Sequence, residues 1–314
     1  MKVILHVGAH RTGTATLQDY MRTNAGALAE MGVGFWGPER RRAGLFARLD
    51  QKPGWRGLCR DPRRRAEGRI RLHLAEAERR GIRTLVISDA AMLGSLRSNF
   101  RARSLYPAAG ERMARLARAF DGRLSTILLC VRSLELYWAS AAGRVVMQGM
   151  APPSAFRLRQ IAARRRGWRD VVTDLACAAP GVRILVMPFE RVAGRPQALL
   201  QHATGLDMPG EGSDIWLNRA PTAAELGEVS GGSALRDAGL VEAGDGRVTV
   251  PASLRSDLRR RYAEDMSWLR SGAEGLAVLT EDLARSDAGT DTPPRADVKG
   301  QDDEPEKGYL ARSG

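Results

Sequence analysis

The sequence predicts an α/β fold, a three-layer sandwich in which helices cover both faces of a parallel β-sheet. Short segments that are apolar on both faces alternate with longer segments of helical periodicity, which is the pattern of parallel strands buried between helices. The 314 residues, of which 43% are hydrophobic, can supply a sizeable core. No apolar run approaches the roughly 18 residues of a membrane-spanning helix. We therefore expect a protein of the cytoplasm without a transmembrane segment.

Four segments are predicted to be strands, because each is a run of β-branched and aliphatic residues. They are residues 2–7, 84–88, 125–131 and 182–187. The first run ends at Gly8 and continues through a short polar loop into residues with helical periodicity. A strand, a loop and a helix thus follow one another directly.

Helices are predicted where apolar residues recur at a spacing of three to four. The predicted helices are residues 66–80, 111–120, 168–178, 195–204 and 253–270. The first of them is followed by Gly81, which suits the left-handed conformation after a helix end. The C-terminal part after Pro188 is accordingly mainly helical. Hydrophobic residues become scarce beyond residue 284, so we predict one domain over residues 1–284 and a disordered tail over residues 285–314.

The basic composition raises the question of a nucleic-acid partner. The net charge is +13, and 45 of the 49 basic residues are arginines. The arginine triplets at residues 40–42, 63–65, 164–166 and 259–261 are scattered along the chain, and only 5% of residues are aromatic, so no stacking platform accompanies them. We interpret the triplets as solvated faces and expect no nucleic-acid partner.

The three cysteines indicate no metal or disulfide chemistry. Cys59, Cys130 and Cys177 are odd in number and far apart, and no histidine stands near them at metal-ligand spacing. We therefore predict neither a disulfide framework nor a zinc site.

The loop after the first strand carries the clearest chemical signal. Its sequence is Gly8-Ala9-His10-Arg11-Thr12-Gly13-Thr14, which has the two glycines of a phosphate-binding P-loop. Glycines let the backbone approach an anion, while N–H groups and the helix N-terminus supply partial positive charge. Because Thr14 and Ala15 follow Gly13, the Lys-Ser/Thr pair of nucleoside triphosphatases is missing. The cation lies inside the loop instead, at Arg11.

A second motif follows the third predicted strand. Arg132 comes directly after this strand, and Ser140 stands eight residues further on in a helical segment. A guanidinium at the carboxyl end of a strand and a hydroxyl two turns into the next helix can converge on one phosphate. Arg132 and Ser140 can therefore lie close enough together to bind one anion.

These motifs resemble those of the sulfotransferases that use 3′-phosphoadenosine 5′-phosphosulfate (PAPS), especially their bacterial branch. The resemblance covers roughly residues 1–283, strongly at the two motifs and loosely elsewhere. Two positions depart from the family pattern: Ala15 replaces the second threonine of Gly-Thr-Thr, and Thr16 replaces a tryptophan that stacks on adenine in some members.

The resemblance implies a P-loop α/β domain that moves a sulfuryl group from PAPS to an acceptor hydroxyl and releases adenosine 3′,5′-bisphosphate (PAP), without a metal. The acceptor would be a carbohydrate, a lipid or a small alcohol. Arg132 and Ser140 would hold the 3′-phosphate. The 5′-phosphosulfate would lie on Gly8, His10, Arg11, Thr12, Gly13, Thr14 and Ala15.

Catalytic roles follow from the charge that develops during transfer. Arg11 is predicted to stabilise the leaving oxygen electrostatically, because a guanidinium gives up no proton at neutral pH. The acceptor hydroxyl also needs a base. Asp89, just after the second strand, is the first candidate, although it equally suits a helix N-cap. His10 is the second candidate and Glu190 the third.

The remaining site features are less specific. Trp168 could stack on adenine, but a tryptophan at a helix start is more often part of the core. Residues 216–250 are expected to help shape the acceptor pocket. His6 is expected in the core, and His73 and His202 on the surface. Two other functions stay open: a P-loop kinase or NTPase, and a catalytically silent nucleotide-binding protein.

Overall fold

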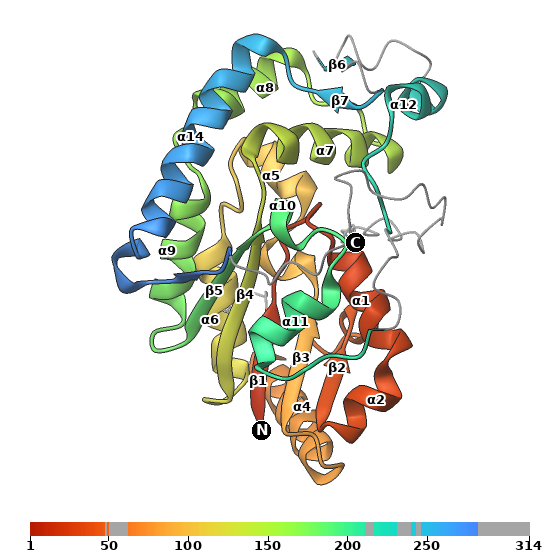
Figure 1. Cartoon of the computed structure of the whole chain (residues 1–314), viewed down its shortest axis with the longest axis vertical. Helices are drawn as coiled ribbons and strands as arrows, with labels where there is room; N and C mark the ends of the chain where they lie inside the picture. Colours follow the sequence, from red (N-terminus) through yellow and green to blue (C-terminus); the bar gives the residue numbers. More distant parts are fainter. Residues whose placement is uncertain (48, 50–61, 211–216, 231–239, 243–245, 282–314) are drawn as a thin grey trace, which may run out of the picture.

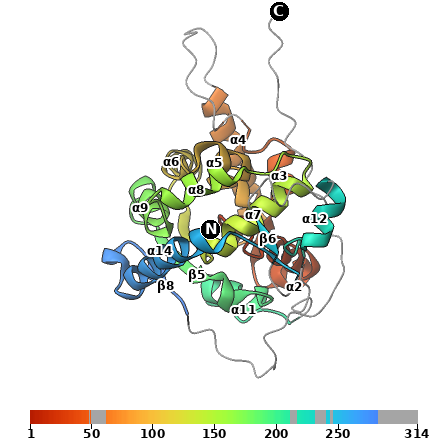
Figure 2. The same cartoon turned by 90° about the horizontal axis from the view of Figure 1, so that it is seen from above.

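The structure is a computed structural model, and it describes residues 1–47, 49, 62–210, 217–230, 240–242 and 246–281. In these residues a parallel sheet of six strands is flanked by helices on both faces (Figures 1 and 2). The predicted α/β class is therefore confirmed. In spatial order the strands are β2 (Val33–Trp36), β3 (Thr84–Ser88), β1 (Lys2–His6), β4 (Leu124–Val131), β5 (Arg183–Pro188) and β8 (Val278–Leu279).

The two faces of the sheet bury alternate residues of each strand, as a period of two requires. Ile4 of β1 packs into a core with residues of four helices, which are α1 (Thr14–Thr23), α2 (Ala25–Glu30), α10 (Phe189–Val192) and α11 (Pro196–Thr204). Its neighbours Val3 and Leu5 pack on the opposite face, with α4 (Pro62–Arg79), α6 (Ala109–Ala119) and α9 (Trp168–Ala178). Figure 2 shows the helices of these two layers on either side of the sheet.

The four predicted strands and five predicted helices are present, with ends that differ by at most four residues. Strands β2 and β8 were not predicted, because they are short edge strands with little periodicity. In β2 the central Gly34 is needed for close packing: a Cβ atom there would lie 2.9 Å from Cγ2 of Ile82.

Part of the chain after Pro188 packs beyond the carboxyl ends of the strands (Figure 1). Helix α7 (Leu134–Met147) contacts α14 (Ala252–Arg270), α12 (Ala223–Ser230) and the strand β7 (Val248–Thr249), which pairs with β6 (Val241–Glu242). This part is mainly helical, as predicted, but the β6–β7 hairpin was not expected. The predicted tail, the domain boundary at residue 284, Cys59 and Trp216 lie outside the described residues. Among the described helices, none has the length and apolarity to cross a bilayer.

Candidate functional site

The loop after β1 is held in place by the neighbouring strand. The Ala9 N–H donates to the Cys130 carbonyl at 3.0 Å, and the Cys130 N–H donates to the Gly8 carbonyl at 2.6 Å, so pairing with β4 continues past the end of β1. The backbone then turns through three left-handed residues, Gly8, Arg11 and Gly13, whose φ angles are 90°, 64° and 76°. Two of the three positions are glycines, as such a turn favours.

Two threonine hydroxyls close the loop on itself. Thr12 Oγ1 donates to the Ala9 carbonyl at 2.8 Å and Thr14 Oγ1 donates to the same carbonyl at 3.2 Å. Helix α1 begins at Thr14 with Gly13 as its N-cap, so the N–H groups of its first turn have no intrahelical acceptor. The loop therefore presents the positive end of a helix at the carboxyl edge of the sheet.

Gly8→Ala is expected to destabilise the protein by about 1–3 kcal/mol. The residue has φ +90°, and a Cβ atom would lie 3.0 Å from Cβ of Ala90, at the start of the 3₁₀ helix η1 (Ala90–Leu93). Urea unfolding measures the loss. Gly122→Ala is the matched control, because Gly122 also has a positive φ, +75°, but has open space around it. Equal losses for the two variants would show that the contact with Ala90 is unimportant.

The two sequence motifs meet in space. Arg11 Nε donates to Ser140 Oγ at 2.9 Å, and Arg132 Nη1 donates to the Arg11 carbonyl at 3.0 Å. Ser140 lies within α7 and is only 5% exposed. Ser140 and Arg132 therefore both contact Arg11 of the loop, one at its side chain and the other at its carbonyl.

Arg132 is a desolvated cation with an unused donor. Its guanidinium carbon lies 4.9 Å from the centre of the Phe189 ring, and its Nε is buried without a hydrogen-bond partner among the described residues. Burial lowers the pKa of Arg132, and the nearby Arg247 lowers it further, while Glu190 opposes the shift. A buried guanidinium N–H group without a hydrogen-bond partner, near a second cation, can stabilise a bound anion.

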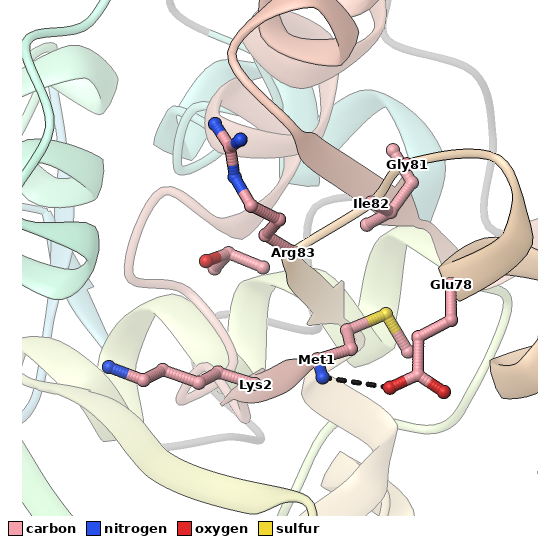
Figure 3. Close-up of a pocket in the computed structure, with 7 residues that line it drawn as sticks. Met1, Lys2, Glu78, Gly81, Ile82 and Arg83 are labelled. Carbon is pink, nitrogen blue, oxygen red and sulfur yellow. Dashed lines mark hydrogen bonds and ion pairs between the residues drawn. The ribbon is translucent and has the colours of Figure 1, made fainter.

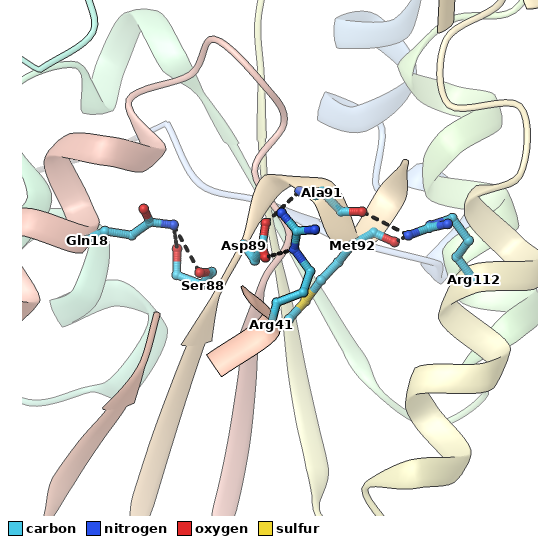
Figure 4. A network of polar contacts seen from close by, with 7 residues as sticks. All are labelled: Gln18, Arg41, Ser88, Asp89, Ala91, Met92 and Arg112. Atoms are coloured by element: carbon cyan, nitrogen blue, oxygen red, sulfur yellow. Dashed lines mark hydrogen bonds and ion pairs between the residues drawn. The ribbon is translucent and has the colours of Figure 1, made fainter. Parts of the chain in front are cut away.

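Asp89 lies directly after β3 with both carboxylate oxygens occupied (Figure 4). Oδ1 accepts the Ala91 N–H at 2.9 Å, which caps η1, and Oδ2 accepts from Nε of Arg41 in α3 (Pro38–Arg42). Arg112 holds the other side of η1, since it donates to the Ala91 and Met92 carbonyls. The helix-cap interpretation of Asp89 is thus present in the structure, together with an ion pair to Arg41.

The other two candidate bases have different surroundings. His10 is half-buried, and burial, with Arg11 and Arg41 nearby, lowers its pKa to about 3, so the ring is neutral at physiological pH. Glu190 accepts the Ser133 N–H at 3.0 Å and the Tyr262 hydroxyl at 3.2 Å. Its carboxylate therefore acts as a bridge between the start of α7 and α14.

Trp168 belongs to the core and cannot stack on a base. Its side chain is fully buried, and its indole Nε1 donates to the Arg132 carbonyl at 2.7 Å. Its main-chain N–H donates to Oδ2 of Asp265 at 2.6 Å, and Asp265 also accepts the Arg169 N–H at 3.3 Å. Asp265 of α14 therefore holds the start of α9 in place, and α9 in turn supports Arg132.

Asp265 is expected to make stability depend on pH. Burial raises its pKa from 3.8 to about 6. The folded state then holds this proton more tightly than the unfolded chain, so the stabilisation is fully present below pH 3.8 and is lost as the pH rises through about 6. Relative to Asp265→Asn, which does not titrate, the wild-type protein should lose about 2 kcal/mol between pH 4.5 and pH 7. Urea unfolding at the two pH values tests this, and parallel pH curves would contradict it.

The histidines outside the loop have the predicted burial, with one exception. His6 is buried, and its Nδ1 lies 2.8 Å from Ser88 Oγ. His73 is exposed and lies edge-on to the Trp36 ring. His202 is half-buried, not fully on the surface, and its Nδ1 bonds to the Ala198 carbonyl of the preceding turn.

Several residues at the site were missed by the sequence analysis. Arg41 and Arg166 belong to triplets interpreted as solvated faces, yet Arg41 pairs with Asp89, and Arg166 donates to the Leu105 and Tyr106 carbonyls. The other missed residues are Tyr106, Phe189 and Arg247. Only Phe189 had a detectable signal, because it comes two residues after a predicted strand, at the edge where the loop lies.

A hollow of about 530 Å³ lies at the opposite edge of the sheet, where β1 and β3 begin (Figure 3). It is lined by Lys2, Glu78, Arg83 and their neighbours, and the Met1 amine pairs with Glu78 at 2.8 Å beside it. None of the predicted site residues lines it. In the part of the chain that is described, no three His, Cys, Asp or Glu side chains gather as metal ligands would.

Comparison with known proteins gave no relative: no protein-family model, no curated protein and no solved structure matches the chain. The functional argument therefore depends on the residues of the site and their geometry. The carboxyl edge of the sheet brings together a glycine loop at a helix N-terminus, two arginines and a serine, namely Arg11, Arg132 and Ser140. Such a set can bind two anionic groups.

Proposed function

We propose that the chain is a sulfotransferase that moves a sulfuryl group from PAPS to an acceptor hydroxyl. The observation that carries the proposal is the contact between the loop and the second motif, in which Arg11 bonds to Ser140 and Arg132 bonds to the Arg11 carbonyl. One cofactor with a 5′-phosphosulfate and a 3′-phosphate would bridge two such adjacent subsites.

The loop binds the 5′-phosphosulfate in this proposal. N–H groups of residues 12–15 and the α1 macrodipole stabilise the negative charge. Sulfuryl transfer, like phosphoryl transfer, develops charge on the leaving oxygen, and Arg11 supplies the cation there. The Arg11 guanidinium is held by Ser140, so PAPS would exchange one oxygen partner for another.

The second motif binds the 3′-phosphate. Arg132 has a buried Nε without a hydrogen-bond partner among the described residues, Ser140 has its hydroxyl next to Arg11 Nε, and Arg247 adds positive charge near Arg132. Phe189 replaces Trp168 as the candidate ring for adenine, because it is half-buried and lies between Gly13 and Arg132. The donor-binding half of the site requires no metal in this proposal.

The acceptor proton would pass to Asp89, from which Arg41 has to move away first. Asp89→Asn is expected to lower turnover about 100-fold or more, while PAP binding stays unchanged, because asparagine keeps an oxygen for the Ala91 N–H. Initial rates with labelled PAPS and calorimetry with PAP measure the two effects. Unchanged turnover would limit Asp89 to its role as a helix cap.

Thermal-shift measurements separate this proposal from its two alternatives. PAP at 100 times its dissociation constant should stabilise the protein by about 2.7 kcal/mol, whereas Mg-ATP should not. Stabilisation by Mg-ATP alone would support a P-loop kinase or NTPase. Stabilisation by neither would support a silent protein with another ligand. Product analysis with carbohydrate, lipid and small-alcohol acceptors would then identify the acceptor, whose pocket is expected near α12 and the β6–β7 hairpin.

A further inference from the structure

The hydroxyl group of one buried residue, Tyr106, connects the loop after β1 to the core. The His10 main-chain N–H donates to the Tyr106 hydroxyl at 2.8 Å, and His10 Nδ1 lies 2.8 Å from the same oxygen. Tyr106 is fully buried, whereas His10 is half-buried. A single buried oxygen therefore fixes both the backbone and the ring of His10.

Tyr106 is itself held in an unusual backbone conformation. Its φ angle is 42°, in the left-handed region that non-glycine residues rarely adopt. Its N–H donates to Asn99 Oδ1 at 3.2 Å, and its carbonyl accepts from Arg166 at 2.9 Å. A strained residue persists only when its surroundings determine it on several sides, and such residues concentrate at functional sites.

The hydrogen-bond donors of this network can be counted. Asn99 uses Oδ1 for the Tyr106 N–H, so its Nδ2 is the donor to the Tyr137 hydroxyl at 3.0 Å. The Tyr106 oxygen accepts the His10 main-chain N–H at 2.8 Å, so the phenol proton needs an acceptor of its own. His10 Nδ1 lies 2.8 Å from the same oxygen and can accept that proton.

The opposite direction of these bonds is less favourable. If His10 Nδ1 donated to Tyr106, the Tyr106 oxygen would accept two protons from His10, and its own buried proton would lose the acceptor that lies 2.8 Å away. In the favoured arrangement Nδ1 accepts a proton, so the neutral ring carries its own proton on Nε2. His10 Nε2 has no partner in the part of the chain that the structure describes.

We propose that the Nε2–H group of His10 donates a hydrogen bond to the anion on the loop, beside Arg11, and that Tyr106 is the positioning residue that fixes this tautomer. The inference rests on the proposed function, since the anion would be the 5′-phosphate of PAP or the phosphosulfate of PAPS. A neutral imidazole donor stabilises negative charge without carrying a proton equilibrium of its own. It also leaves the role of base to another residue.

Nitrogen NMR of the full chain with ¹⁵N-labelled histidine tests the tautomer. The chain has four histidines, and His10→Gln identifies the His10 signals by their loss. At pH 7 we expect an unprotonated Nδ1 and a protonated Nε2, whose proton shifts downfield when PAP is added. A protonated Nδ1 would overturn the inference. An Nε2–H signal that does not move while PAP raises Tm would overturn it and leave the proposed function intact. A Tm that PAP does not change would overturn the proposed function first.

Two tyrosine variants test the positioning role. Tyr106→Phe removes the donor to Nδ1, so we expect a mixture of tautomers and PAP affinity that falls about threefold to tenfold. Tyr137→Phe is the matched control, because the Tyr106 hydroxyl can still donate to Nδ1 and the tautomer should be kept. Equal behaviour of the two variants would contradict the role of Tyr106.

A second pair of variants serves if Tyr106→Phe does not fold. His10→Gln places an amide N–H donor near the position of Nε2, whereas His10→Asn places its polar atoms near Nδ1. We expect His10→Gln to bind PAP about threefold to tenfold more tightly than His10→Asn. The reverse order would overturn the inference.

Discussion

Arg11→Ala is expected to lower the rate of sulfuryl transfer by about 100-fold to 1000-fold, the usual cost of removing one group that stabilises charge in the transition state. Arg11 is the cation inside the loop, and its Nε already lies 2.9 Å from Ser140, next to the proposed 3′-phosphate subsite. The effect should fall on kcat more than on PAP affinity, because the charge on the leaving oxygen develops only during transfer. Initial rates with labelled PAPS measure it.

Two control variants accompany this measurement. Arg157→Ala removes one positive charge from an exposed position on α8 (Ala155–Ala163), away from the loop, and should leave the rate unchanged. Ser140→Ala removes the partner of Arg11 but keeps its charge, so it should weaken PAP binding and lower kcat less than Arg11→Ala. Near wild-type turnover of Arg11→Ala would disprove the assigned role of Arg11.

Trp168→Ala is expected to cost about 3–5 kcal/mol of folding free energy, which is a large part of the 5–15 kcal/mol typical of a domain. The side chain is fully buried, its ring packs edge-on against Tyr137 at 5.6 Å, and its indole holds the Arg132 carbonyl. The variant should unfold at much lower urea concentration. Phe156→Ala is the control, because Phe156 is 60% exposed and its removal should change stability by less than about 0.5 kcal/mol.

Trp168→Phe distinguishes the contribution of the ring to core packing from the contribution of the indole N–H to positioning Arg132. Phenylalanine keeps most of the buried ring but cannot donate to the Arg132 carbonyl, so stability should fall by only about 1 kcal/mol. PAP affinity should fall as well, because the backbone at Arg132 loses its partner. Unchanged PAP affinity in a folded Trp168→Phe variant would show that the indole bond does not position Arg132.

The predictable part of the site is local in sequence. The glycine loop runs directly from β1 into α1, and Arg132 and Ser140 are separated by eight residues along one strand-to-helix connection. Parallel strands place such connections at the same edge of the sheet, so the two motifs could be expected to lie close together. The individual contacts of Arg11 with Ser140 and Arg132 were not predicted, because they join residues more than 100 positions apart.

The unpredicted part of the site depends on contacts between distant segments. Tyr106 lies 96 residues from His10, and Arg41 lies 48 residues from Asp89. An arginine triplet has the same sequence pattern whether it is solvated or pairs with a buried carboxylate. The short edge strand β2 shows the same dependence, because the close packing at its Gly34 comes from Ile82 and Leu85 of a distant segment.

The sequence by itself determined the central strands, the helices that cover them and a loop rich in glycine and threonine that ends at a helix N-terminus, since these depend on periodicity and on local backbone preferences. The tertiary structure decided what the chemical groups at this edge are bound to: Asp89 caps η1 and pairs with Arg41, Trp168 supports Arg132 from the core, and Tyr106 orients His10. The physical reason is that burial and hydrogen-bond partners set the protonation and direction of a polar group, and both come from segments far away in the chain.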